Sequence, residues 1–321
     1  MFLEVKNLDV YYKTVNGTSH VLDGFNLKMD QGGVVSIVGE SGSGKSTLGL
    51  AITKLLPMSA IEKGEIYLDG TELVGLSESQ ITNYRGTTVF MIFQNPLNSL
   101  NPVKTVGSQL TEAVRIRSRR KNENLTADEI YNEAVQTLKL MRLPDPQSIM
   151  TRYPHELSGG QVQRVVISMA LILKPKLLIA DEPTTALDVT IQAQVINLLK
   201  EMNKTYKMSV IFITHDLSLA YVLSDQVIVM YAGRIMEQGV SESLIRKPLH
   251  PYTAGLLMSV PTKSKDAGPL FSISGAPPSF FNLPKGCKFF PRCKEAFTPC
   301  GDREPAIVPV DSSMVRCWLY E

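Results

Sequence analysis

The sequence contains little cysteine and tryptophan and has no long apolar run. Four cysteines and one tryptophan occur in 321 residues, and no cysteine precedes Cys287. No apolar stretch approaches the roughly 18 to 20 residues that a membrane-spanning helix needs. The start, MFLEVKNLDVYY, is charged early and then alternates, unlike a signal peptide. We therefore expect the chain to stay in the cytosol, where structural disulfides are uncommon.

The sequence also lacks an excess of charge of one sign. The net charge is +2 and charged residues make up 20%, which is ordinary for a soluble globular protein. This balance argues against nucleic-acid binding through a single-sign field. The basic run RIRSRRK, Arg115 to Lys121, lies beside the stretch NENLTADE. We interpret it as a solvated loop or helix end, with contact to nucleic acid or to lipid head groups as the alternatives.

The chain is longer than one compact core usually requires, which predicts two packed units or one core with appendages. Short apolar or alternating segments predict strands at 3–12, 34–39, 64–73, 88–94, 176–181, 209–216 and 226–233. A helix is predicted from Lys45 to Pro57, and helical spacing returns between Asn95 and about Pro154. Alternating strands and helices predict an α/β fold with a largely parallel sheet. Eleven prolines between 248 and 310 predict a tail with little helix or central strand.

The stretch GESGSGKS, from Gly39 to Ser46, follows a predicted buried strand and precedes a predicted helix. It matches the phosphate-binding pattern G-x-x-x-x-G-K-[ST]. Glycines permit a tight loop whose N–H groups surround phosphate oxygens, and the helix N-terminus adds partial positive charge. Lys45 would reach the β- and γ-phosphates, and Ser46 would ligate Mg²⁺. A Gly/Ser-rich turn is the alternative, but the strand–loop–helix context favours nucleotide binding.

Two further motifs extend this prediction. KLLIADE ends in Asp181 and Glu182, two carboxylates at the carboxyl end of a strand, where open α/β sheets bind their ligands. Asp181 would complete the Mg²⁺ shell and Glu182 would polarise an attacking water, although such a pair can also cap a helix. LSGGQ, Leu157 to Gln161, opens a helical run and is a second anion-binding pattern. Two such sites imply either two anions or a nucleotide held by another copy.

With Gln94 in MIFQNP, TALD (Thr185 to Asp188) and ITHD, which contains His215, these motifs resemble the ATP-binding cassette (ABC) ATPase family. The resemblance covers residues 1 to about 240. It implies an α/β, P-loop NTPase fold with a mostly parallel sheet core, an antiparallel β subdomain and a helical subdomain at about 95–160. It also implies that two cassettes pair head to tail, so that LSGGQ of one closes on ATP held by the other.

The resemblance implies a role for each motif residue. Tyr12 would stack on adenine, with Tyr11 as the weaker candidate, and strand packing is the alternative for both. Gln94 would contact Mg²⁺ and the attacking water, and Asp188 would lie in the loop that joins the cassettes. The catalytic residues would be Lys45, Gln94, Glu182 (the general base) and His215 (at the γ-phosphate). The residues assigned to nucleotide binding are Tyr12, Gly39, Ser41, Gly42, Ser43, Gly44, Lys45, Ser46, Thr47, Gln94, Ser158, Gly159, Gly160, Gln161, Asp181 and Asp188, of which Ser46, Gln94 and Asp181 would bind Mg²⁺. No role is assigned to His20, His155 or His250.

NPLNSLNP (95–102), HPYTAGLLMSVP (250–261) and GAPPSFFNLPKGCKFFPRC (275–293) resemble the dipeptide and oligopeptide import branch, which includes nickel importers. The resemblance implies an ATP-hydrolysing subunit that powers peptide uptake, bound peripherally at the cytoplasmic side of the cell membrane. Its partners would be transmembrane permease subunits, a second ATPase chain (identical or different) and, indirectly, an extracytoplasmic peptide-binding protein. Residues 1–240 would form the ATPase domain and 241–321 a C-terminal extension.

Two other functions compete with this one. A cassette that clamps DNA or acts in translation usually has two cassettes or a long coiled coil, and this sequence has one cassette and no sustained heptads. We therefore expect no nucleic-acid partner. A non-hydrolysing nucleotide sensor conflicts with the intact Glu182 and His215. Dipeptides, longer peptides and nickel stay open as cargo.

All four cysteines lie in the last 35 residues, at Cys287, Cys293, Cys300 and Cys317. Their spacing lacks the short C-x₂₋₄-C knuckle that is usual in structural zinc sites. Four thiolates in a segment with little other framework favour a metal that organises the fold. We interpret them as ligands of a 4Fe–4S cluster, with zinc as the alternative, followed by disulfides or free thiols. The basic residues expected to offset the thiolate charge are Lys285, Lys288, Arg292, Lys294 and Arg316.

Overall fold

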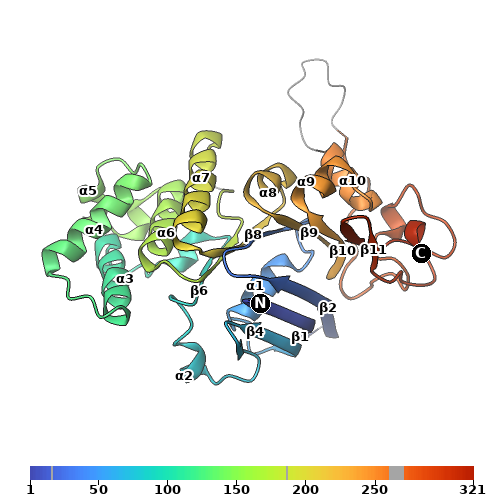
Figure 1. The fold of residues 1–321 in the computed structure, drawn as a ribbon, viewed down its shortest axis with the longest axis horizontal. Helices are drawn as coiled ribbons and strands as arrows, with labels where there is room; N and C mark the ends of the chain where they lie inside the picture. The colour runs from blue at the N-terminus through green and yellow to red at the C-terminus, as the bar shows by residue number, and fades with distance from the viewer. Residues whose placement is uncertain (16, 186, 260–270) are drawn as a thin grey trace, which may run out of the picture. The chain divides into compact units, whose positions relative to one another are not determined.

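The computed structural model describes residues 1–15, 17–185, 187–259 and 271–321 (Figure 1). Two compact units make up the fold. The first combines Met1–Ser77 with Ile211–Glu321, and the second is Glu78–Val210. Within the described ranges, no helix has the length and apolar content needed to cross a membrane.

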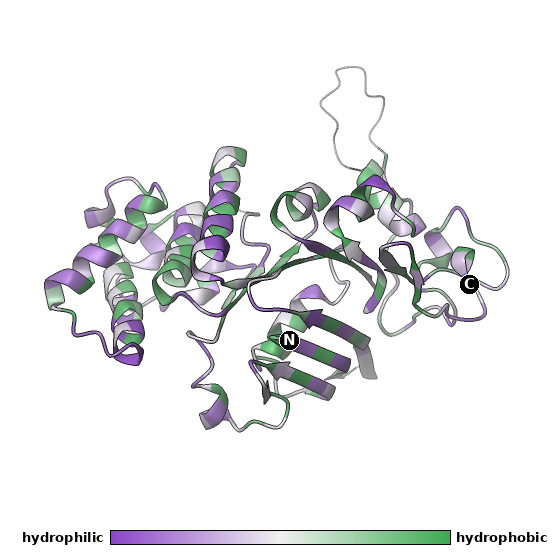
Figure 2. Cartoon of the chain, in the orientation of Figure 1, coloured by the Kyte–Doolittle hydropathy of each residue, from purple (hydrophilic) through white to green (hydrophobic). Residues whose placement is uncertain are grey.

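The first unit begins with an antiparallel sheet of order β2-β1-β4-β5. Its strands are β1 (Leu3–Thr14), β2 (Gly17–Met29), β4 (Ala60–Leu68) and β5 (Thr71–Glu72). Hydrophobic and hydrophilic bands alternate along β1 and β4 in Figure 2, as expected for a sheet with one buried face. The predicted turn at Asp69 and Gly70 is confirmed, because both residues have positive φ (52° and 80°) between paired strands. The sequence does not predict β2, which starts with the polar residues GTSH.

A second sheet crosses the first unit, where its strands follow the order β11-β12-β10-β9-β3-β8. Strands β3 and β9 pair in parallel, and β10, β12 and β11 follow as antiparallel neighbours. These strands are β3 (Val34–Val38), β8 (Ser209–Thr214), β9 (Gln226–Tyr231), β10 (Arg234–Val240), β11 (Val308–Val310) and β12 (Ser313–Val315). Every residue of β3 and β8 is buried, which explains their continuous apolar sequences. The helices of this unit are α1 (Lys45–Ile52), α8 (Leu217–Leu223), α9 (Ser241–Arg246) and α10 (Pro251–Met258).

Helix α1 is shorter than predicted. The sequence predicts a helix that runs to Pro57, but α1 ends at Ile52. The N–H and the hydroxyl of Thr53 both donate to the Gly49 carbonyl, at 3.1 and 2.8 Å. Lys54 then adopts a φ of 54°, so the chain leaves the helix before the proline.

Strand β10 follows Gly233 directly, in a segment for which the sequence predicts no strand. Ala232 and Gly233 have φ values of 45° and 83°, and this turn joins β9 and β10 as a hairpin. The register shifts between Ile235 and Glu237, which removes the clean alternation that would identify a strand. Pairing with β9 and β12, rather than local pattern, therefore defines β10.

The described part of the proline-rich tail contains one helix and two short strands. Pro251 stands at the first position of α10, where its missing N–H costs nothing. Val260 and Pro261, which end the HPYTAGLLMSVP motif, lie outside the described residues. Elsewhere in the described tail, turns and the 3₁₀ segments η3 (Phe290–Arg292) and η4 (Trp318–Tyr320) predominate, in agreement with the sequence.

The second unit combines helices with two parallel strands, β6 (Val89–Ile92) and β7 (Leu177–Asp181). Helix α3 packs against α4, α5 and α6. The helical segments are α2 (Glu78–Ile81), η1 (Pro96–Ser99), α3 (Val106–Arg120), α4 (Ala127–Leu140), α5 (Pro146–Thr151), η2 (Pro154–Glu156), α6 (Gly159–Leu173) and α7 (Val189–Tyr206). Helices are thus present where the sequence predicts them, while the limits of a helical subdomain at 95–160 stay a prediction.

The basic run from Arg115 to Arg120 forms the end of α3, and Lys121 is its C-cap, so the predicted helix end is confirmed. Arg117 within it is buried, and its guanidinium pairs with Glu133 (2.8 Å) and Glu123 (3.1 Å). These pairs raise the pKa of Arg117. The central charge of the run therefore stabilises contacts inside the second unit.

Candidate nucleotide site and cysteine pocket

The predicted phosphate loop connects β3 to α1 in the first unit. Its path needs glycine at Gly42 and Gly44, whose φ values of 77° and 98° are left-handed. Lys45 is buried, and its Nζ donates to the carbonyl oxygens of Gly39 (2.7 Å) and Glu40 (2.8 Å). The ammonium group is thus held against the loop by these two carbonyl oxygens. When a nucleotide binds, its phosphate oxygens would take their place as acceptors.

The other predicted phosphate ligands belong to the same loop and helix start. Ser41 is exposed, Ser43 is buried, and Ser46 and Thr47 are half-buried in the first turn of α1. The Ser43 Oγ lies 3.4 Å from the Lys45 Nζ. The loop therefore presents hydroxyl groups and the first turn of a helix together, which is an anion-binding arrangement.

Tyr12, rather than Tyr11, lies beside this loop. The Tyr12 hydroxyl is 3.5 Å from the Thr47 Oγ1. The Tyr11 ring instead stacks on His20, with ring centroids 4.1 Å apart and an interplanar angle of 14°. Successive residues of a strand point to opposite faces, so only one of the pair faces the loop.

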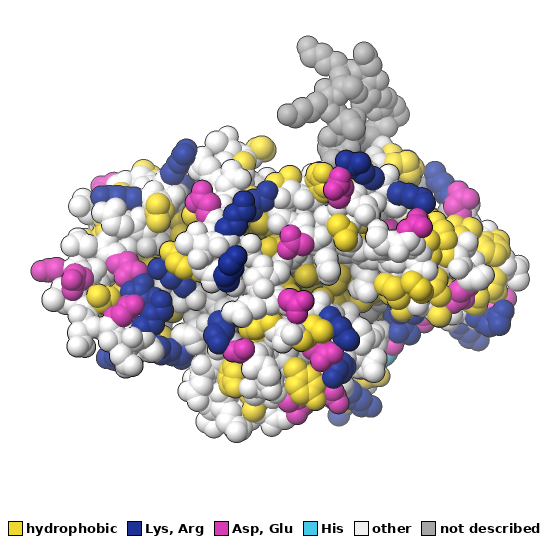
Figure 3. Space-filling view, in the orientation of Figure 1, with side chains coloured by type: hydrophobic (Ala, Val, Ile, Leu, Met, Phe, Trp, Pro, Cys, Tyr) yellow, Lys and Arg dark blue, Asp and Glu magenta, His cyan; other side chains and the backbone are white. Residues whose placement is uncertain are grey.

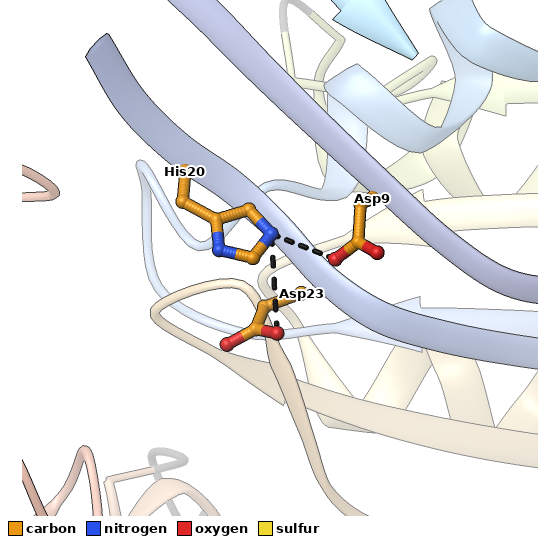
Figure 4. A group of neighbouring side chains, drawn as sticks. All are labelled: Asp9, His20 and Asp23. Carbon is orange, nitrogen blue, oxygen red and sulfur yellow. Dashed lines mark hydrogen bonds and ion pairs between the residues drawn. The ribbon is translucent and has the colours of Figure 1, made fainter. Parts of the chain in front are cut away.

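His20 belongs to a group with Asp9 and Asp23, shown in Figure 4. Its Nε2 lies 2.7 Å from the Asp9 Oδ1 and 3.9 Å from the Asp23 Oδ1. Arg234 pairs with Asp23 at 2.8 Å, and the Gly24 N–H donates to Asp9 at 3.1 Å. Because protein groups already compensate both carboxylates, we interpret this group as a structural link between β1, β2 and β10.

Gln94 and Glu182 meet within the second unit. The Gln94 Nε2 donates to the Glu182 Oε2 at 3.2 Å, and the Thr185 Oγ1 donates to the same oxygen at 3.1 Å. Glu182 has a φ of 46°, a left-handed conformation that is uncommon for a non-glycine residue and is often found at functional sites. Asp181, the preceding residue, is buried at the end of β7. Thr185 is a partner of Glu182 that its sequence position did not reveal.

The LSGGQ motif forms the start of α6. The Ser158 side chain accepts from the Gln161 N–H (3.4 Å), and the Gln161 side chain accepts from the Ser158 N–H (2.9 Å). This capping box holds Gly159 and Gly160 in the first turn. Ser158 and Gly159 are exposed, and a Cβ added at Gly159 would meet no atom within 4 Å. The turn is therefore open to a ligand.

Asp188 and His215 lie at the ends of secondary-structure elements. Asp188 caps α7, where its Oδ1 accepts from the N–H groups of Thr190 (3.1 Å) and Ile191 (3.0 Å). Ala186 of the same TALD motif lies outside the described residues. His215 follows β8 directly and is exposed. Helix capping accounts for Asp188 locally, so its predicted place in the loop between cassettes stays a prediction.

All four cysteines line one small pocket in the first unit. Cys287, Cys300 and Cys317 are buried, Cys293 is half-buried, and all four are free thiols. The Cys287 N–H donates to the Cys300 carbonyl at 2.9 Å. Only glycine fits at Gly286, because a Cβ there would lie 2.2 Å from that carbonyl oxygen. Residues up to 30 positions apart are thus brought to one site.

Apolar side chains surround this pocket. Figure 3 shows hydrophobic side chains gathered on the surface where the C-terminal residues lie. Phe290, Phe297 and Leu319 line the pocket and are still 38%, 45% and 48% exposed. They therefore form the wall between the thiols and the solvent.

His250 also lines the pocket, and nothing in the sequence pattern assigns it this place. Its Nδ1 accepts from the Tyr252 N–H at 3.0 Å, so the neutral ring carries its proton on Nε2. That buried Nε2 makes no well-formed hydrogen bond within the described residues. Burial lowers the pKa of His250 to about 3. The pocket wall thus contains a neutral N–H donor.

Burial favours the protonated form of three of the four thiols. Burial raises the pKa of Cys287 and that of Cys317 to about 11, and it also raises the pKa of Cys293. A thiolate is the form that binds a metal. A metal at this site would therefore have to displace protons from the thiols.

Two of the basic residues expected to offset thiolate charge are engaged elsewhere. Lys288 lies 3.5 Å from Glu304, and Arg292 lies 2.6 Å from Glu40. Arg316 donates to the Ile235 carbonyl at 3.1 Å. Lys288 and Arg292 thus have carboxylate partners of their own, and their role in offsetting thiolate charge stays a prediction.

Comparison with protein-family models matches residues 22–185 to the ABC transporter family. The chain belongs to the ABC transporter family. Residues 236–300 of this ABC chain also match the oligopeptide/dipeptide transporter, C-terminal region. The predicted family and its import branch are therefore confirmed.

Relatives and solved structures agree with this placement. The chain is 46% identical to the oligopeptide transport ATP-binding protein OppD of Bacillus subtilis (strain 168), over 99% of this chain and 88% of OppD. It is 43% identical to the dipeptide transport ATP-binding protein DppD of Haemophilus influenzae, over 98% and 94%. The ATP-binding cassette MJ0796, solved as a dimer in a post-hydrolysis state with ADP and Pi, has a TM-score of 0.67 and 29% identity, over 75% of this chain and 99% of that one. The predicted cassette fold and ATPase class are confirmed.

Proposed function

We propose that this ABC ATPase powers the uptake of dipeptides or oligopeptides. The observation that carries the proposal is the 46% identity to an oligopeptide transport ATP-binding protein across 99% of the chain. The match of residues 236–300 to the oligopeptide/dipeptide C-terminal region supports the same cargo class.

In this proposal the motif residues act on ATP and Mg²⁺. Lys45 and the loop amides hold the phosphates, and Ser46, Gln94 and Asp181 hold Mg²⁺. Glu182 accepts a proton from the attacking water, a role supported by its constrained backbone and its two side-chain donors. Tyr12 stacks on adenine, and His215 contacts the γ-phosphate.

The partners follow from the transporter class. Two transmembrane permease subunits receive the chain at the cytoplasmic side of the membrane, where it is bound peripherally. A second ATPase chain, identical or different, completes the ATP sites with its LSGGQ turn, and the open turn at Gly159 supports this pairing. An extracytoplasmic binding protein delivers the peptide. Residues 1–240 act as the ATPase domain and 241–321 as the extension.

Substitution of the proposed base tests the enzymatic part. Glu182→Gln keeps the size of the side chain but removes the proton acceptor, so turnover should fall by about 10²- to 10⁴-fold while ATP binding persists. Glu201→Gln, an exposed residue of α7, is the matched control and should keep full turnover. Unchanged hydrolysis in Glu182→Gln would refute the assignment of the base. Peptide uptake in cells that carry Glu182→Gln should stop, and continued uptake would refute the cargo assignment.

We also propose that the cysteine pocket holds a 4Fe–4S cluster. Within the described residues, no three of the thiol sulfurs lie within 4.8 Å of one another. A zinc ion with four bonds of about 2.3 Å would hold its sulfurs about 3.8 Å apart, whereas a cluster spaces them further because each binds a different iron. When bound, the cluster would supply the iron that displaces the thiol protons. The apolar wall of Phe290, Phe297 and Leu319 would limit the access of water to the cluster.

Metal analysis of the anaerobically purified full chain tests the pocket. A cluster predicts about four iron and four sulfide per chain and absorption near 400 nm, all lost in Cys287→Ser. One zinc in a colourless protein would replace the cluster assignment with zinc. Metal-free protein with four titratable thiols would refute both.

A further inference from the structure

Arg292, in the cysteine-bearing tail, forms a two-pronged ion pair with the phosphate loop. Its Nη1 lies 2.6 Å from the Glu40 Oε2, and its Nη2 lies 3.0 Å from the Glu40 Oε1. Glu40 is the second residue of GESGSGKS. The Arg292 side chain is only 5% exposed and that of Glu40 is 26% exposed, so this two-pronged pair is less screened by solvent than a surface pair.

Further hydrogen bonds fix the guanidinium in place. The Arg292 Nε donates to the Ser274 carbonyl (2.9 Å), Nη2 donates to the Ile273 carbonyl (3.2 Å), and Nη1 donates to the Tyr231 hydroxyl (3.2 Å). The pairing with Glu40 raises the pKa of Arg292 beyond its usual range. The side chain is therefore a pre-positioned, permanently charged group.

The backbone of Glu40 is held by the same region of the chain. Its N–H donates to the Tyr252 hydroxyl at 2.9 Å. Phe289 packs against the Tyr231 and Tyr252 rings, with centroids 5.4 and 5.1 Å apart. The second position of the phosphate loop is thus fixed at its side chain and at its backbone by residues beyond the cassette motifs.

We propose that Arg292 is a positioning residue for ATP binding, which acts by neutralising the charge of Glu40. ATP brings several negative charges to a loop that already contains this carboxylate, so an unpaired Glu40 would oppose binding. With Arg292 in place the charge of the carboxylate is compensated, so it does not oppose the phosphates. The inference rests on the proposed binding of ATP at Gly39–Ser46, and it extends that site to the C-terminal extension.

Substitutions of Arg292 and Glu40 in the full chain distinguish an effect on ATP binding from simple anchoring of the tail. Arg292→Gln should raise the Kd for ATP about tenfold, which is within the usual range of coupling between sites, and should raise KM with kcat changed less than about twofold. Arg292→Lys should restore part of the affinity because it keeps the charge. Glu40→Gln combined with Arg292→Gln should bring the Kd back to within about threefold of the original, because the opposing carboxylate is gone.

Three comparisons make the outcome decisive. Arg303→Gln removes the same charge from an exposed position of the tail and should leave the Kd unchanged. An unchanged Kd in Arg292→Gln, or a double variant no better than Arg292→Gln, would overturn the proposal. If Arg292→Gln does not fold, Glu40→Gln alone decides: the proposal expects a Kd at or below the original, and a tenfold rise overturns it. Lys45→Ala should abolish ATP binding, and retained binding there would instead refute the loop assignment.

Discussion

The Tyr252 hydroxyl accepts a hydrogen bond from the backbone N–H of Glu40 at 2.9 Å, although 212 residues separate the two in sequence. Tyr252 is fully buried, so this N–H would find no water to replace its acceptor. The phosphate loop is therefore partly built by α10.

Tyr252→Phe should destabilise the chain by about 1 to 3 kcal/mol, because it leaves a buried backbone donor without its acceptor. The Kd for ATP should rise as well, because the loop loses a fixed point. Denaturant unfolding and equilibrium ATP binding measure the two effects. Tyr221→Phe, at an exposed position of α8, is the control and should change neither. Unchanged stability of Tyr252→Phe would contradict the role of this bond.

Tyr12→Ala should weaken ATP binding by at least about fivefold, since stacking of an aromatic ring on a base contributes about 1 to 3 kcal/mol. Tyr12→Phe retains the ring and should bind nearly normally. Tyr11→Ala is the matched neighbour: it removes the ring stacked on His20 and should leave ATP affinity unchanged. Titration with a fluorescent ATP analogue measures all three. Equal losses at both positions would show that neither ring stacks on adenine.

Cys293→Ser should weaken ATP binding about threefold to tenfold, since Arg292 directly precedes this cysteine and the pocket helps to fix η3. The effect should not add to that of Arg292→Gln, because both act through the same contact with Glu40. ATP binding is measured without turnover, so the result does not depend on hydrolysis. Fully additive losses would show that the cysteine and the arginine act independently.

Thr126→Ala should destabilise the second unit by about 1 kcal/mol, the usual cost of losing a helix N-cap. Thr126 and Glu129 form a capping box at α4, in which the Thr126 N–H donates to the Glu129 carboxylate at 2.8 Å. Backbone and side-chain hydrogen bonds from Thr126 lower the pKa of Glu129 below 4.5. The folded pKa is depressed, so the contribution of Glu129 is present above its unfolded pKa and is lost as pH falls through the folded value.

The free energy of unfolding, measured between pH 7 and pH 3, checks the direction of this pH dependence. The stability difference between the original chain and Glu129→Gln should be constant near neutrality and should shrink as pH falls through the folded pKa of Glu129. Thr111→Ala, in the interior of α3, is the control and should show no such narrowing. A difference that grows on acidification would contradict the assignment.

The buried strands were predictable because the residues of each strand carry the signal themselves. β3, β8 and β9 are buried on both faces, and that environment selects continuous apolar runs that the sequence displays. Strand β10 has a register shift, and β2 begins with polar residues, so pairing with neighbouring strands defines them. Local pattern cannot carry that information.

The residues of the candidate site also fall into two groups: those that the sequence predicts and those that only the fold brings to the site. Lys45, Asp181 and Glu182 stand in contiguous motifs whose chemistry fixes their type and spacing. Arg292 and Tyr252 reach the loop through tertiary packing alone, because the position of a distant side chain depends on every intervening element. The four cysteines are intermediate: their clustering is visible in the sequence, whereas their common pocket and the place of His250 in its wall are not.

The pair between Glu40 and Arg292 can form only late in synthesis, because Glu40 is made long before Arg292. The two residues are 252 positions apart, and a ribosome that adds about 5 to 20 residues per second needs roughly 13 to 50 s to make that distance. During this interval the phosphate loop is complete in sequence, but its carboxylate has no arginine partner. If Arg292 acts as proposed, a nascent cassette would bind ATP about tenfold more weakly until Arg292 has left the ribosome and paired with Glu40.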